Sequence, residues 1–100
     1  MKIILTTCPE KESEILAQKL LEEKLCACIS ITNAKSLYWW KGKIEKGNEV
    51  LLIIKTKDDL ADKLMKRIKE IHSYENPEII VLNVEKAAEK YLKWIDEVTK

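Results

Sequence analysis

The chain has 100 residues, 35% of them charged, and its eighteen basic side chains nearly balance its seventeen acidic ones, which leaves a net charge of +1. This length predicts a single domain, residues 1–100, with one core and a large exposed surface. The small net charge argues against a general electrostatic attraction to nucleic acid or to a membrane surface, and no apolar run approaches the roughly 20 residues that span a bilayer.

The first predicted strand, residues 3–5, begins almost directly after Met1. This start lacks the basic region and the long apolar stretch of an export signal, so we expect a cytoplasmic protein. The three cysteines agree with that expectation, because an odd number argues against a disulfide framework and fits a reducing compartment.

A helix is predicted over residues 11–24. Pro9 suits the first turn of a helix, and the polar residue before it can act as a cap. Leu16 and Leu20 belong to a series of apolar residues at three- and four-residue steps, which indicates a helix with one apolar stripe that packs on a sheet.

Two long β-runs follow, residues 28–40 and 43–56, folded back on each other at Lys41-Gly42-Lys43. We expect a bulge or kink at Gly47. The first run reaches roughly 40 Å at about 3.3 Å per residue, whereas the preceding helix spans only about 20 Å at about 1.5 Å per residue. The tip of this hairpin therefore extends beyond the helical layer.

The overhanging tip carries Tyr38, Trp39 and Trp40. Aromatic side chains held in water beside unpaired strand edges are an aggregation hazard unless another copy of the chain covers them. We therefore predict an obligate oligomer with these three residues at the subunit interface, where Trp and Tyr are common anchors. Stacking on nucleic-acid bases is the weaker alternative, because the surrounding charge is mixed and the central run 50–54 is wholly aliphatic.

Two helices and one strand are predicted after the hairpin. Asp58 or Asp59 can cap a second helix that ends near His72, a strand follows at residues 79–84, and a third helix runs from Glu85 or Ala87 to the C-terminus. The order β-α-β-β-α-β-α predicts an α+β fold, the ferredoxin-like split βαβ sandwich, with an antiparallel sheet, a long hairpin and an extra C-terminal helix.

Both faces of this sheet are predicted to be buried. Residues 3–5, 50–54 and 79–82 are continuous apolar runs, without the alternation expected when one face meets water. The two main helices cover one face only, so the added helix and sheets from other subunits are expected to cover the second. Closed cyclic symmetry is the usual outcome of such pairing.

Six stretches, taken together, resemble the CutA divalent-cation tolerance family. They are residues 6–9, 25–29, 37–43 with the Tyr-Trp-Trp tip, 50–56, the His-to-Pro-Glu segment 72–78, and the Tyr-Leu-Lys-Trp of 91–94. The resemblance implies a homotrimer whose long hairpins build an inter-subunit sheet, similar in architecture to the nitrogen-signalling trimers. The chain departs from the family at Cys26, where alanine is usual, and at Ser73, where proline is usual.

The resemblance also implies copper or another divalent ion as ligand, with Cys8, His72 and Glu78 as metal ligands. A thiol, an imidazole and a carboxylate together favour Cu or Zn over Mg or Ca. The position of Cys8 at the start of a helix is expected to favour its thiolate. Each residue also has an ordinary structural interpretation, as a cap, a helix end and a strand start. Their wide separation and the lack of a standard metal-motif spacing favour that interpretation.

Cys26 and Cys28 are two residues apart in a strand-like run and are expected to share a face. They could hold a soft metal ion together. Packing in the core is the favoured interpretation, because no third ligand lies nearby in the sequence.

The sequence does not favour an enzyme. It has one histidine, a single arginine at Arg67, no Gly-rich phosphate loop and no nucleophile elbow. We expect no catalysis and no organic cofactor. The leading hypothesis is a trimeric divalent-cation tolerance protein. The alternative is a trimeric scaffold or small-molecule sensor for which metal binding is incidental.

Overall fold

The structure, a computed structural model, describes residues 1–100 and combines one sheet with three helices. The elements in chain order are β1 (Lys2–Cys8), α1 (Glu10–Glu22), β2 (Cys28–Trp40), β3 (Lys43–Thr56), a 3-10 turn (Asp58–Leu60), α2 (Ala61–Ile71), β4 (Ile79–Asn83) and α3 (Glu89–Val98). The strand order is β2-β3-β1-β4, and every neighbouring pair is antiparallel. The predicted α+β, ferredoxin-like fold with a long hairpin and an added helix is confirmed.

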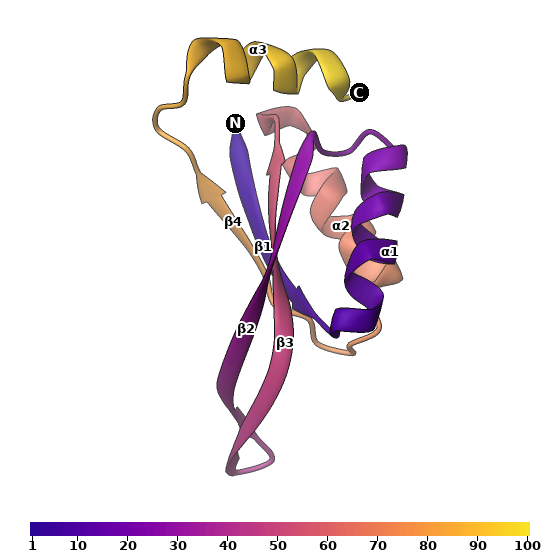
Figure 1. Cartoon of the computed structure of the whole chain (residues 1–100), viewed down its shortest axis with the longest axis vertical. Coiled ribbons are helices and arrows are strands. Elements are labelled where there is room, and N and C mark those ends of the chain that lie inside the picture. Colours follow the sequence, from indigo (N-terminus) through magenta and orange to yellow (C-terminus); the bar gives the residue numbers. More distant parts are fainter.

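The core lies between the sheet and the pair α1 and α2, which sit on the same side of it (Figure 1). Alternate residues of the central strands point into this layer, and Ile4, Leu52 and Ile54 are fully buried. The apolar stripes of the two helices supply the facing side chains, among them Leu20 and Leu64. Each such side chain contributes roughly 1.5–3 kcal/mol through burial.

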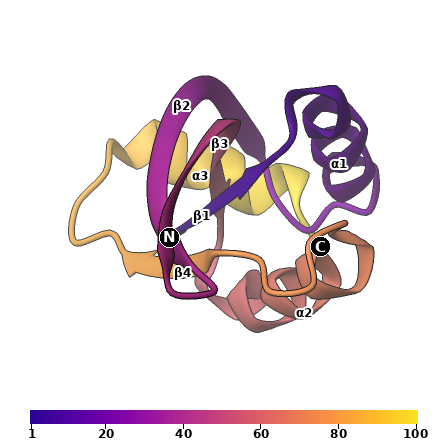
Figure 2. The same ribbon diagram turned by 90° about the horizontal axis from the view of Figure 1, so that it is seen from below.

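The other face of the sheet carries neither α1 nor α2 (Figure 2). Its apolar side chains are only partly buried, and Ile80 and Leu82 remain 44% and 43% exposed. The set that shares this face by strand register is Ile3, Leu5, Leu51, Ile53, Ile80 and Leu82. One chain therefore leaves an apolar sheet surface uncovered.

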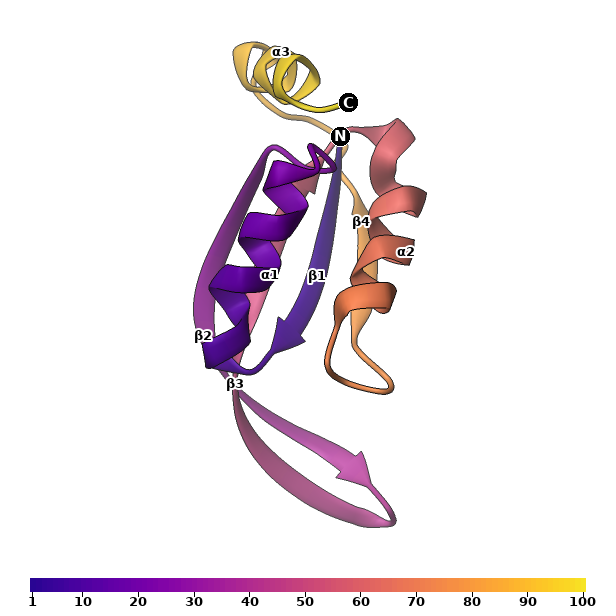
Figure 3. The same cartoon turned by 90° about the vertical axis from the view of Figure 1, so that its right-hand side faces the viewer.

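Helix α3 lies across the end of the sheet rather than along its open face (Figure 3). Ile95 anchors it, with 1% of the side chain exposed, and Tyr91 lies against Cys28. The expectation that the added helix starts at Glu85 or Ala87 is wrong, because Ala88 still has extended backbone at ψ 134° and α3 begins at Glu89. No helix of the structure combines the length and the apolar character needed to cross a membrane.

The hairpin of β2 and β3 forms a ribbon that extends past the ends of β1 and of both helices (Figure 3). It gives the molecule a long axis of 45 Å against 26 and 21 Å for the other two. Lys41 and Gly42, at φ of 49° and 78°, form its two-residue turn. Positive φ at both positions is the geometry that suits the twist of paired strands.

The expected bulge at Gly47 is wrong. The register is unbroken from the pair Cys28 and Lys55 to the pair Trp40 and Lys43. A Cβ at Gly47 would lie 3.5 Å from the ring of Tyr38. That distance is an ordinary van der Waals contact, so the Tyr38 ring packs over the strand at this position.

The predicted side-chain caps of α1 and α2 are also absent. Pro9 occupies the N-cap position of α1 and Leu60 that of α2, and neither helix has a side-chain cap hydrogen bond. Asp58 instead accepts a 2.6 Å bond from the Met1 ammonium group. This contact lowers the pKa of the Asp58 carboxyl.

Candidate functional site

Cys8 is the last residue of β1 and faces the core, with 1% of its surface exposed. Burial, followed by the nearby carboxylates of Glu12 and Glu49, raises the pKa of the thiol from 9.0 to about 11. The expectation that the helix start favours its thiolate is therefore wrong. Desolvation of the charged form outweighs the helix dipole here. Near neutral pH, Cys8 is a protonated, buried thiol.

His72 follows α2 directly, and both nitrogens of its half-buried ring have partners. Nε2 lies 2.8 Å from the carbonyl oxygen of Thr7, and Nδ1 accepts a 3.0 Å hydrogen bond from the backbone N–H of Tyr74. A carbonyl can only accept and an amide N–H can only donate, so the ring is neutral with its proton on Nε2. The single lone pair of the imidazole is thus already engaged.

Glu78 is exposed and lies just before β4. It is the most accessible of the three proposed metal ligands. No group of three or more His, Cys, Asp or Glu side chains in the chain is arranged to hold a metal ion. The structure does not gather Cys8, His72 and Glu78 into a preformed metal centre, and their role as ligands stays a prediction.

Sequence reasoning missed the pair formed by Tyr74 and Glu49. The Tyr74 hydroxyl donates a 2.8 Å hydrogen bond to the Glu49 carboxylate, and the Tyr74 ring lies 4.8 Å from that of His72. Burial, together with this bond, raises the pKa of Tyr74. Glu49 is one residue before the buried run of β3, and nothing in its spacing from Tyr74 marks the contact.

The two other cysteines lie at the opposite end of the sheet. Cys26 is 2% exposed and belongs to the core cluster, which confirms core packing for this residue. It precedes β2, so the expected common strand face is wrong. Cys28 is half-buried, with the Lys55 ammonium group 3.8 Å from its sulfur. Lys55 also donates a hydrogen bond to Ser30.

The ribbon tip keeps the aromatic residues predicted for the subunit interface in solvent. The exposed fractions of Tyr38, Trp39 and Trp40 are 46%, 74% and 53%. The Lys41 ammonium group lies 5.7 Å from the centre of the Trp40 ring. No element of the same chain shields this tip.

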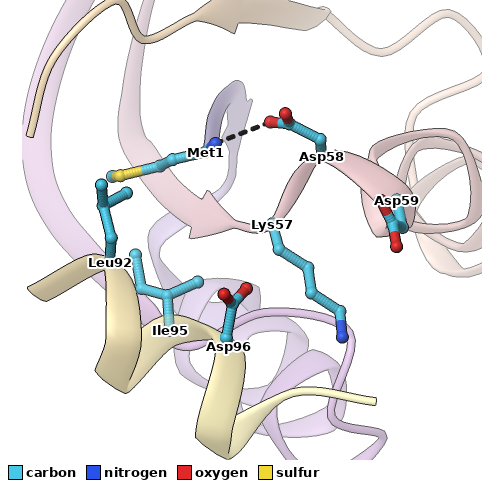
Figure 4. A pocket seen from close by; sticks show the side chains of 7 residues that line it. All are labelled: Met1, Lys57, Asp58, Asp59, Leu92, Ile95 and Asp96. Atoms are coloured by element: carbon cyan, nitrogen blue, oxygen red, sulfur yellow. Dashed lines mark hydrogen bonds and ion pairs between the residues drawn. The ribbon is translucent and has the colours of Figure 1, made fainter.

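A hollow of about 540 Å³ lies between α3 and the 3-10 turn (Figure 4). It contains the ion pair of the Met1 ammonium group with Asp58. The lining residues are Met1, Lys57, Asp58, Asp59, Leu92, Ile95 and Asp96. Binding pockets of this size are mostly apolar, whereas charged side chains dominate this lining. The hollow therefore offers little to an apolar ligand.

The sheet order, the two helices on one face and the protruding ribbon define a small ferredoxin-like α+β protein. The sequence profile of the family described as "CutA1 divalent ion tolerance protein" matches residues 2–98. The chain belongs to this family, and the resemblance found in its sequence is confirmed.

Named relatives share the whole domain. The chain is 46% identical to the divalent-cation tolerance protein CutA of Pyrococcus horikoshii, over 100% of this chain and 99% of that protein. It is 42% identical to protein CutA of Homo sapiens, over 94% of this chain and 54% of that protein.

Solved structures agree with the fold at full length. CutA1 from Pyrococcus horikoshii superimposes with a TM-score of 0.97 at 44% identity, covering 100% of this chain and 99% of that one. A protein described as the PII-like protein CutA from Nostoc sp. PCC 7120 gives a TM-score of 0.96 at 34% identity, covering 100% and 98%.

Proposed function

We propose that this protein acts as a homotrimer in the tolerance of divalent cations, with copper or another divalent ion as its ligand. Membership of the CutA1 family supports the role in cation tolerance. The number of subunits is taken from the resemblance in sequence. The function is one of binding rather than catalysis.

The observation that supports an oligomer is the apolar surface that a single chain leaves exposed to water. The open sheet face, with Ile80 and Leu82, and the ribbon tip, with Trp39, are both uncovered. The two edge strands, β2 and β4, also have unpaired outer edges. Association of copies would bury both apolar regions and pair these edges.

For the ion, we propose weak binding near residues 72–78 through exposed donors. Glu78 is exposed, whereas the Cys8 thiol is buried and the imidazole lone pair of His72 is engaged. Further donors would come from neighbouring subunits, because one chain offers no group of three suitable side chains. We place the protein in the cytoplasm, and its three free cysteines are consistent with that proposal.

Calorimetric titration of the reduced protein with copper tests ion binding. We expect saturable heat that weakens in Glu78→Gln and is unchanged in Glu14→Gln, an exposed carboxylate on α1 that serves as the matched control. Loss of a direct carboxylate ligand should lower affinity by about tenfold or more. Equal affinities of the two variants would contradict the role of Glu78.

The alternative function is a trimeric scaffold or small-molecule sensor. Two observations favour it: two of the three proposed metal ligands are already engaged or buried, and the fold is similar to a protein described as PII-like. The absence of saturable copper binding in the titration would favour this alternative.

A further inference from the structure

A small set of polar contacts centred on His72 fixes the position of the connection between α2 and β4. The His72 backbone N–H donates to Ile68 and closes the last turn of α2. Nε2 of its ring donates to the Thr7 carbonyl of β1, and Nδ1 accepts a hydrogen bond from the Tyr74 N–H. One side chain therefore links the end of a helix, a central strand and the following turn.

Tyr74 extends this link to a second strand. Its hydroxyl donates to Glu49 of β3, and its ring packs beside the His72 ring. Glu49 lies next to Val50, the residue paired with the end of β1 at Cys8. The contact thus joins the α2–β4 connection to β3 at the base of the ribbon.

The bond to Nδ1 also explains how this turn is ordered without a proline. Ser73 lies between the ring that accepts and the Tyr74 N–H that donates, so the bond closes a tight loop around Ser73. Proline would restrict this segment by fixing its own φ. In this chain a side-chain hydrogen bond supplies the restraint instead.

The same hydrogen bonds disfavour coordination of a metal ion by the imidazole. A neutral imidazole has one lone pair, and metal ligands use it. An ion at Nδ1 would have to displace the Tyr74 N–H. An ion at Nε2 would have to take the place of the bonded proton, directly in front of the Thr7 carbonyl oxygen.

From this geometry we infer that His72 is a structural clamp, meaning that its contacts hold the end of α2, strand β1 and the following turn together. We also infer that divalent cations bind this protein through donors other than its imidazole. The second part of the inference rests on the proposed function, since it concerns how the same ion is bound. The first part depends only on the contacts of His72. The two parts therefore call for two separate measurements.

The chain has a single histidine, so ¹⁵N-labelled histidine gives one imidazole spectrum from the intact oligomer. The first measurement is made without metal. We expect the neutral tautomer with the proton on Nε2, slowly exchanging, and Nδ1 as an acceptor. A proton on Nδ1, or a mixture of tautomers, would overturn the clamp whether or not the protein binds any ion.

The second measurement adds Zn²⁺, which is diamagnetic, while calorimetry reports whether it binds. Bound zinc with unchanged Nδ1 and Nε2 resonances supports the inference. A large shift of either resonance on saturation overturns it. If calorimetry shows no zinc binding, the proposed ion binding fails while the tautomer result still decides the clamp.

A variant provides an independent check. His72→Ala should lower the denaturation midpoint, because the ring contacts to Thr7 and Tyr74 are lost, and should leave zinc affinity unchanged. Tyr74→Phe removes only the bond to Glu49 and should keep the Nε2 tautomer. A loss of zinc affinity of about tenfold or more in a folded His72→Ala protein is the effect expected of a ligand and would refute the inference.

Discussion

The ionisation of two buried thiols, Cys8 and Cys26, is coupled to folding. Burial, with a smaller contribution from Cys28, raises the pKa of Cys26 from 9.0 to about 12. Burial likewise raises that of Cys8 to about 11. The folded chain therefore holds these protons at a pH where the unfolded chain releases them.

This difference predicts alkaline destabilisation with a definite sign. The stabilisation from a raised pKa is complete below the unfolded value near 9.0 and is lost as pH rises through the folded values of about 11 and about 12. The free energy of unfolding, measured by denaturant titration, should fall across this window. Cys26→Ala should reduce the slope, and an unchanged slope would contradict the assignment.

At the residue scale, sequence reasoning singled out Cys8 and His72 and missed their partners. The thiolate expected at Cys8 is wrong, and the metal-ligand role that the resemblance implies for His72 stays a prediction. The thiol is neutral because neighbouring elements bury it. The His72 ring is engaged because a backbone carbonyl 65 positions away faces it. The sequence does not indicate which backbone group will contact a side chain, so only the fold identifies such a partner.

The end of α1 illustrates a local rule that the chain breaks. The Lys24 N–H donates to the Leu21 carbonyl and the Leu25 N–H to the Leu20 carbonyl, the bond pattern of a Schellman motif. Lys24 occupies the left-handed position at φ 58°. Glycine is the usual residue there because it has no Cβ to clash.

We therefore predict that Lys24→Gly stabilises the protein by about 1 kcal/mol, since it relieves left-handed strain. The matched control is Lys19→Gly, in the last turn of α1, which should destabilise by a similar amount because glycine is a poor helix former. Both changes remove an exposed lysine, so a shared charge effect would move both midpoints in one direction and contradict the explanation.

At the element scale, periodicity predicted the helices and strands well, because each apolar stripe faces one core. Single residues that usually mark a bulge or a helix cap were less informative. Gly47 suggested a bulge, yet it sits in a regular register beneath Tyr38. Asp58 suggested a cap, yet it pairs with the Met1 ammonium group. For Asp58, a partner distant in sequence decides the role of the residue.

At the scale of the whole molecule, the uncovered surface is the dominant feature. The ribbon extends beyond its own helices, and the second sheet face is apolar (Figures 1 and 3). Sequence reasoning predicted both from strand length and from the lack of alternation. It could not give the relative placement of subunits, because that depends on surfaces assembled from distant segments.

A charge placed on the open face should separate the subunits. Ile80→Lys puts a lysine on edge strand β4, where we propose that a neighbouring copy packs, and burying an unpaired charge there is costly. Ile15→Lys is the matched control, since Ile15 is 71% exposed on α1 and lies on the other side of the sheet. Light scattering should show a smaller mass for Ile80→Lys alone; equal masses for the two variants would argue against this interface.

Sedimentation velocity of the native protein at micromolar concentration tests the central claim most directly. We predict one species with three times the 11.6 kDa mass of a single chain, and no monomer on dilution. A folded, soluble single subunit under these conditions would contradict the oligomer and the proposal that ions bind between its chains.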